Sequence, residues 1–134
     1  MTHTALVTGA SSGIGFHIAQ ELAQRGYDIV GVGSSERILE LPEKLPDVEV
    51  IPLRADLTDR ADVERLWEEF ERTGRTLDVA ALNAGRSLGG SFLDTDLEDQ
   101  LQLLELNVTS QVILAKHVAL NAILAIGMTF VIIT

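Results

Sequence analysis

The chain contains no cysteine and few aromatic side chains, which make up 4% of its 134 residues. Without cysteine it can form neither disulfides nor thiolate sites, a composition that fits a reducing compartment. No charged and apolar leader precedes the first predicted strand, so we expect a cytoplasmic protein. With 46% hydrophobic residues and a mean hydropathy of +0.23, the chain is long enough for one domain with a buried core, over residues 1–134.

Basic residues are also scarce. Ten Lys and Arg stand against twenty Asp and Glu, which gives a formal net charge of −10 at pH 7. Proteins that bind the nucleic-acid backbone need clustered basic residues, and these are scattered, so we expect no nucleic-acid partner. The three histidines, His3, His17 and His117, are far apart and lack ligand spacing, so we predict no metal site.

One long stretch, residues 118–134, carries no charge. Its length is marginal for a membrane span, and Asn121 and Gly127 interrupt it. A helix that ends near Gly127, followed by a buried parallel strand at residues 128–134, explains the pattern better. We therefore expect no membrane partner.

A glycine-rich turn is the most informative feature that is present. The apolar strand at residues 5–7 leads into Thr-Gly-Ala-Ser-Ser-Gly-Ile-Gly at residues 8–15, and a helical pattern follows. Gly9 can take the positive φ of a sharp turn, and Gly13 and Gly15 let the backbone approach a ligand and a neighbouring strand. The free N–H groups at the start of the helix favour a pyrophosphate. No Gly-Lys-Ser/Thr follows, which excludes a mononucleotide P-loop.

Strands and helices alternate along the rest of the chain. Further strands are predicted at residues 28–32, 48–53, 77–82 and 128–134. One helix is predicted at about 14–25, a second is capped by Thr58 or Asp59 and ends at Thr73-Gly74, and a third covers about 96–126 with Asp94 or Thr95 at its start. This alternation predicts an α/β fold, a Rossmann-like doubly wound parallel sheet with strand order 3-2-1-4-5. Ligands of such sheets bind where the order reverses, at the carboxyl ends of strands 1 and 4.

Four segments resemble the fingerprints of the short-chain dehydrogenases/reductases. The turn matches the family's Thr-Gly-x-x-x-Gly-x-Gly pattern at residues 8–15, and Asn83-Ala84-Gly85 matches its Asn-Ala-Gly segment, although Leu82 stands where the family often has another Asn. Asp56-Leu57 resembles its adenine-ring contact. Asn107 stands where the family places the catalytic-tetrad Asn that holds a proton-relay water. The resemblance implies NAD(P)-dependent hydride transfer to or from a small carbonyl or alcohol substrate.

The choice of cofactor depends on the end of the second strand, where Gly33-Ser34-Ser35 replaces the acidic residue that favours NAD. This small neutral turn leaves space for a 2′-phosphate, so we predict NADP, with NAD as the alternative, although the family's usual Arg just after the strand is missing. Together, the turn and the resemblance predict Asn107 as a catalytic residue, and as cofactor-binding residues Gly9, Ser11, Ser12, Gly13, Ile14, Gly15, Ser34, Ser35, Arg37, Asp56, Leu57, Asn83, Ala84 and Gly85.

The residues that the family uses for proton transfer are missing. The 134 residues contain no Tyr-x-x-x-Lys, and the only tyrosine, Tyr27, is followed four residues on by Gly31. We therefore expect a domain truncated relative to the family, which does not turn over a substrate as an isolated chain. The alternative is a non-catalytic dinucleotide-binding or assembly module from a truncated gene product. An unpaired strand edge and an uncovered face predict a homo-oligomer through residues 102–125.

Overall fold

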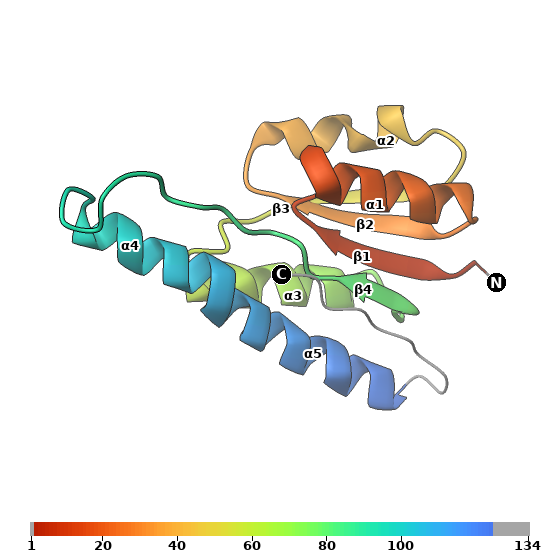
Figure 1. Cartoon of the computed structure of the whole chain (residues 1–134). Helices are drawn as coiled ribbons and strands as arrows, with labels where there is room; N and C mark the ends of the chain where they lie inside the picture. The colour runs from red at the N-terminus through yellow and green to blue at the C-terminus, as the bar shows by residue number, and fades with distance from the viewer. Residues whose placement is uncertain (1, 125–134) are drawn as a thin grey trace.

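The computed structural model describes residues 2–124 and contains a four-stranded parallel sheet with helices on both faces (Figure 1). The strands are β1 (Thr4–Thr8), β2 (Asp28–Gly33), β3 (Val50–Arg54) and β4 (Val79–Ala81), and they are hydrogen-bonded in the order β3-β2-β1-β4. This order confirms the parallel Rossmann-like sheet for these strands. The predicted fifth strand, residues 128–134, lies outside the described residues.

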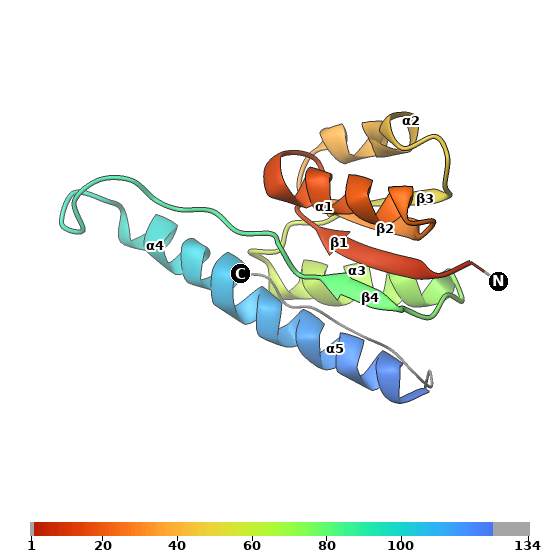
Figure 2. The same cartoon turned by 45° about the vertical axis from the view of Figure 1, so that its right-hand side comes forward.

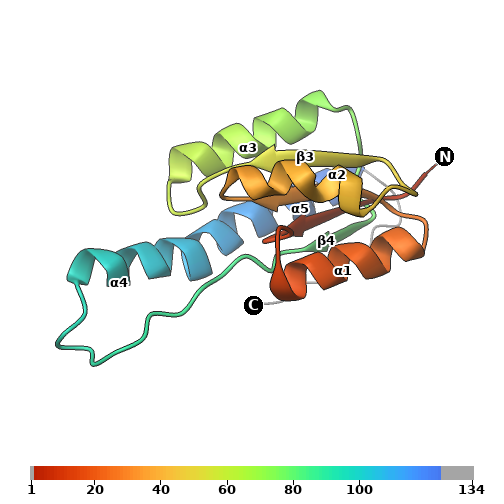
Figure 3. The same cartoon turned by 90° about the horizontal axis from the view of Figure 1, so that it is seen from above.

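Three helical segments cover one face of the sheet. They are α1 (Gly13–Gln24), the 3₁₀-helix η1 (Glu36–Glu40) and the short α2 (Leu41–Lys44). On the opposite face, α3 (Arg60–Arg72) and α5 (Ser110–Leu124) pack side by side (Figure 2). The remaining helix, α4 (Leu97–Leu104), projects beyond the carboxyl edge of the sheet (Figure 3).

Apolar residues on the two sides of the strands form two cores. Every residue of β1 and β2 is buried, as expected for central parallel strands covered on both faces. The apolar stripe of α3 packs on one side, and Ala19, Ile38 and Leu41 pack on the other. Among residues 2–124, no helix is long and apolar enough to cross a membrane.

The long helix predicted near residues 96–126 is not one regular α-helix. Its N-cap is Asp96, whose carboxylate accepts a hydrogen bond from the Glu98 N–H at 2.8 Å, so the predicted start at Asp94 or Thr95 is wrong by one or two residues. The α-helix ends at Leu104, and a π-helical turn, Glu105–Thr109, joins it to α5. Such a turn accommodates one extra residue, which apolar periodicity does not reveal. It contains Asn107.

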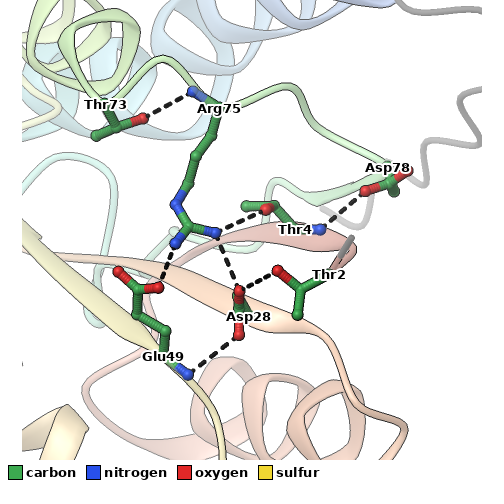
Figure 4. Close-up of polar contacts among 7 residues, drawn as sticks. All are labelled: Thr2, Thr4, Asp28, Glu49, Thr73, Arg75 and Asp78. Carbon is green, nitrogen blue, oxygen red and sulfur yellow. Dashed lines mark hydrogen bonds and ion pairs between the residues drawn. The ribbon is translucent and has the colours of Figure 1, made fainter.

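A polar network closes the amino-terminal edge of the sheet, opposite the glycine-rich turn (Figure 4). The Asp28 carboxylate, at the start of β2, accepts hydrogen bonds from the Thr2 hydroxyl at 2.7 Å, the Glu49 N–H at 3.1 Å and Arg75 Nη1 at 3.0 Å. The Arg75 guanidinium also donates to the Thr4 hydroxyl at 3.2 Å and to the Glu49 carboxylate. One side chain from the α3–β4 loop therefore joins the starts of three neighbouring strands.

Candidate functional site

The glycine-rich turn has the backbone conformation that its glycines permit. Gly9 has a φ of +68°, which confirms the predicted positive φ, and Gly13 also lies in the left-handed region with a φ of +59°. A Cβ at Gly15 would overlap the carbonyl oxygen of Gly9 and lie 2.6 Å from Asn83 Nδ2. Only glycine therefore allows α1 to begin this close to the end of β1.

The start of α1 is arranged to receive an anion. Ser12 is the N-cap residue, but within residues 2–124 its side chain makes no capping hydrogen bond, and the first turn of α1 contains no acidic residue. The N–H groups of the first turn have no intrahelical acceptors and add to the positive end of the helix dipole. A Cβ at Gly13 would meet no described atom within 4 Å outside its chain neighbours and the backbone of its own helix, and Ser12, Gly13 and Ile14 line a hollow in front of this helix.

Thr8 ties the turn to the segment that follows β4. Its Oγ1 accepts hydrogen bonds from the N–H groups of Asn83 and Ala84, both at 2.9 Å, and its carbonyl accepts one from Asn83 Nδ2 at 3.3 Å. Thr8 is 1% exposed, so water does not compete for these bonds. The Asn-Ala-Gly segment and the glycine-rich turn consequently form one rigid unit at the carboxyl edge of β1 and β4.

Two hollows meet at this unit and together form a cleft along the carboxyl edge of the sheet. The first, with a volume of about 390 Å³, lies on the side of β2 and β3, and predicted residues that line it include Gly9, Ser34, Asp56, Leu57, Ala84 and Gly85. The second lies between α1 and α5, and predicted residues that line it include Ser12, Gly13, Ile14, Asn83 and Asn107, together with Gly9, Ala84 and Gly85 of the first.

The β3 side of the cleft is held by hydrogen bonds around Asp56. Its Oδ1 accepts from the N–H and the hydroxyl of Thr58, at 3.0 and 2.6 Å, and its own N–H donates to Asp62. The hydrogen bond from Arg65 holds the pKa of the Asp62 carboxyl below its usual value, so this acceptor stays ionised. Leu57, the residue after Asp56, is only 6% exposed and belongs to the core.

The other side of the cleft is shaped by the π-turn. The Asn107 carboxamide accepts a hydrogen bond from the Arg86 N–H at 3.0 Å and donates one to the Arg86 carbonyl at 2.7 Å. One helical turn later, Gln111 Nε2 donates to the Ala84 carbonyl at 3.0 Å. Asn107 and Gln111 thus hold the segment after β4 from the helix side, and Asn107 lies at the cleft as the family resemblance implies.

Four of the predicted cofactor-binding residues, Ser11, Gly15, Ser35 and Arg37, line neither of the two hollows. Gly15 lies beneath the turn, and Ser11 packs against Gly33. Ser35 caps η1 by accepting a hydrogen bond from the Arg37 N–H at 3.4 Å, and the Arg37 side chain is exposed on that short helix. Residues that we did not predict also line the cleft or its margin, and they include Arg54, Thr58, Arg86, Gln102, Leu106 and Gln111.

The chain is similar in sequence and in structure to known proteins. The sequence model of the family described as short chain dehydrogenase matches residues 3–127. The chain belongs to this family. Residues 3–127 therefore correspond to the amino-terminal part of the family's sequence.

Individual relatives and a solved structure agree with this assignment. The Probable NADP-dependent dehydrogenase of Haemophilus influenzae is 30% identical over 124 residues, covering 91% of this chain and 49% of the relative. The Uncharacterized oxidoreductase YmfI of Bacillus subtilis is 34% identical over 122 residues, covering 87% of this chain and 49% of the relative. A solved short-chain dehydrogenase from Sphingobium yanoikuyae, in complex with NADPH, has a TM-score of 0.87 and 34% identity, covering 97% of this chain and 52% of that chain. The chain spans about half the length of the curated relatives that it matches.

Proposed function

We propose that this chain binds NADP(H) in the cleft and is the cofactor-binding part of an oxidoreductase that transfers a hydride between the nicotinamide and a carbonyl or alcohol substrate. The observation that carries the proposal is the start of α1, where free N–H groups, open space and no acidic residue in the first helical turn favour a pyrophosphate. The rest of the cleft fits a dinucleotide, because it extends from this turn toward Asp56 on one side and Asn107 on the other.

Two further observations support NADP over NAD. The turn directly after β2 is Ser34-Ser35, so the acidic residue that favours NAD at the end of this strand is replaced by neutral side chains. Among relatives, one is named NADP-dependent and a similar solved structure holds NADPH.

We also propose that the 134 residues bind the cofactor without turning over a substrate. The family's Tyr-x-x-x-Lys does not occur in them, and Tyr27 lies at the amino-terminal edge of β2, with its ring 5.8 Å from that of His3. A positioned acid–base group typically contributes about 10²–10⁴-fold to a rate. A non-catalytic dinucleotide-binding or assembly module is the alternative, and a cytoplasmic location stays a prediction.

The Ser12→Asp variant tests the phosphate site without removing the helix cap. Asp is a good N-cap residue, so the unfolding midpoint should stay the same or rise, but its charge faces the bound phosphates. We expect NADPH, titrated by its fluorescence, to bind the wild-type chain and to bind this variant at least about tenfold more weakly, since tenfold is only about 1.4 kcal/mol. The neutral cap variant Ser12→Asn should retain most of the affinity.

The same titration decides the wider proposal. If neither NADPH nor NADH shows saturable binding to the wild-type chain, the cofactor-binding function is wrong. Protein-dependent NADPH oxidation with any member of a panel of aldehydes and ketones would instead refute the absence of turnover.

We further propose a second copy of the chain as a partner. Apolar side chains that are 46–66% exposed recur every three or four residues along α4, the π-turn and α5, at Leu97, Leu101, Leu104, Val108 and Val112. Such a contiguous stripe on a helix is typical of a protein interface. It lies within or next to the surface predicted from the sequence, residues 102–125.

Sedimentation of the wild-type chain should then give about twice the 14.5 kDa mass of one copy. Leu104→Glu should shift the population to the monomer, because a carboxylate cannot be buried unpaired at an apolar interface. Leu39→Glu, on the comparably exposed Leu39 of η1, is the matched control and should leave the mass unchanged. A wild-type monomer at all concentrations would contradict this interface.

A further inference from the structure

A hollow at the ends of β2 and β3 lies next to the cleft. It is lined by Ser34, Arg54, Ala55, Asp56, Asp62 and Arg65, of which Ser34, Ala55 and Asp56 also line the cleft itself. Gly33 and Arg54 are register partners in the sheet, so the last residue of β3 stands beside the turn that follows β2. Two arginines therefore face the place where a neutral Ser-Ser turn replaces an acidic residue.

One of the two arginines already makes three hydrogen bonds within the protein. The Arg65 guanidinium bonds to Asp62 at 2.6 Å, to Glu69 at 2.9 Å and to the carbonyl of Arg54 at 2.8 Å. These acceptors come from three directions and include two carboxylates. Arg65 is consequently neutralised and positioned by its neighbours, and Asp62 is neutralised with it.

Arg54 is engaged much less. Its Nε donates one hydrogen bond to the Ser34 carbonyl at 3.3 Å, and its Nη1 lies 3.8 Å from a Glu36 carboxylate oxygen. The Glu36 side chain is 83% exposed, and an exposed pair at this separation is weak. The bond to Ser34 holds the guanidinium against the turn, and the remaining N–H groups have no closer acceptor within residues 2–124.

We propose that Arg54 is the residue that selects a dinucleotide with a 2′-phosphate, by binding that phosphate beside the Ser34 hydroxyl group. The proposal rests on the proposed cofactor function, because it needs the adenosine to lie at this end of the cleft. A guanidinium presents paired N–H donors that match phosphate oxygens, and a phosphate near −2 charge competes well with the single exposed carboxylate of Glu36. The basic residue thus comes from β3, whereas the sequence suggested Arg37, whose exposed side chain lines none of these hollows.

The test compares NADPH and NADH affinities of the 134-residue chain and its Arg54→Ala variant. Loss of a charge-assisted hydrogen bond should weaken NADPH binding about tenfold to a hundredfold. NADH binding should change less than about twofold, because NADH lacks the phosphate that Arg54 contacts. Arg54→Lys keeps the charge without the paired donors and should fall between the two. Arg72→Ala removes an exposed arginine on α3, away from the cleft, and is the matched control.

The outcomes separate this inference from the cofactor function. If the wild-type chain binds NADPH but Arg54→Ala lowers the affinities for NADPH and NADH equally, or changes neither, the role of Arg54 is refuted while the cofactor function stands. The same holds if Arg37→Ala alone lowers NADPH affinity. If neither dinucleotide binds the wild-type chain, both fail together. An unchanged urea midpoint of Arg54→Ala checks that the variant is folded.

Discussion

Gly15→Ala is expected to lose about 3 kcal/mol of stability, near the upper end of what overpacking one methyl group costs. The added Cβ would overlap the Gly9 carbonyl oxygen and lie 2.6 Å from Asn83 Nδ2. Gly9 follows Thr8, whose hydroxyl oxygen accepts hydrogen bonds from the N–H groups of Asn83 and Ala84. The Gly9 carbonyl therefore cannot move without breaking those bonds. The start of α1 must therefore shift away from β1.

The displacement should also reduce cofactor affinity, because the N–H groups of the first helical turn would no longer face the phosphates. We expect NADPH binding to fall more than tenfold in Gly15→Ala, a loss of at least about 1.4 kcal/mol. Urea unfolding and NADPH titration measure the two effects. Gly89→Ala is the matched control, since a Cβ there meets no described atom within 4 Å, and it should leave both unchanged. A Gly15→Ala chain as stable as that control would show that the turn has more freedom than its packing indicates.

The glycine-rich turn and the order of the first four strands could be predicted because their signals are local. Glycines in a strand-to-helix turn and apolar strands that alternate with helices predict a parallel sheet with right-handed connections. In such a sheet the ligand site lies at the carboxyl edge of β1 and β4. The positive φ of Gly13 was not predicted, because the glycine spacing shows where small residues stand but not which of them takes a left-handed conformation.

Arg54 and the π-turn could not be predicted because they depend on register and packing. Arg54 reaches the turn after β2 because it pairs with Gly33, and the register in which two neighbouring strands pair cannot be read from either segment alone. Arg37, which the sequence predicted as a cofactor-binding residue, is exposed on η1 and lines none of the three hollows. The π-turn places Asn107 against Arg86, and the helical pattern on either side of it continues without an interruption in polarity.

Arg75→Met, which removes the guanidinium from the network at the amino-terminal edge of the sheet, should also cost a large part of the stability (Figure 4). Asp28 is 6% exposed, and in Arg75→Met it would remain buried with only the Thr2 hydroxyl and the Glu49 N–H. Breaking a buried ion pair costs about 3–5 kcal/mol, and we expect about 2 kcal/mol here because the Arg75 side chain is 20% exposed. Arg72→Met, which breaks an exposed pair with Glu68, is the control and should cost less than about 0.5 kcal/mol.

The stability lost in Arg75→Met should depend on pH, because hydrogen bonds hold the pKa of Asp28 below its usual value. The bond from the Thr2 hydroxyl lowers this pKa most, and the bond from Arg75 lowers it further. A lowered pKa in the folded state stabilises the protein above the unfolded carboxyl pKa of about 3.9, and that stability disappears as pH falls through the folded value. Arg75→Met raises the folded pKa of Asp28, so its urea midpoint should lie furthest below that of the wild type near pH 7 and approach it below about pH 4. Wild-type and Arg75→Met midpoints that stay equally far apart from pH 7 to pH 3 would mean that the ion pair of Arg75 with Asp28 is not the source of the lost stability.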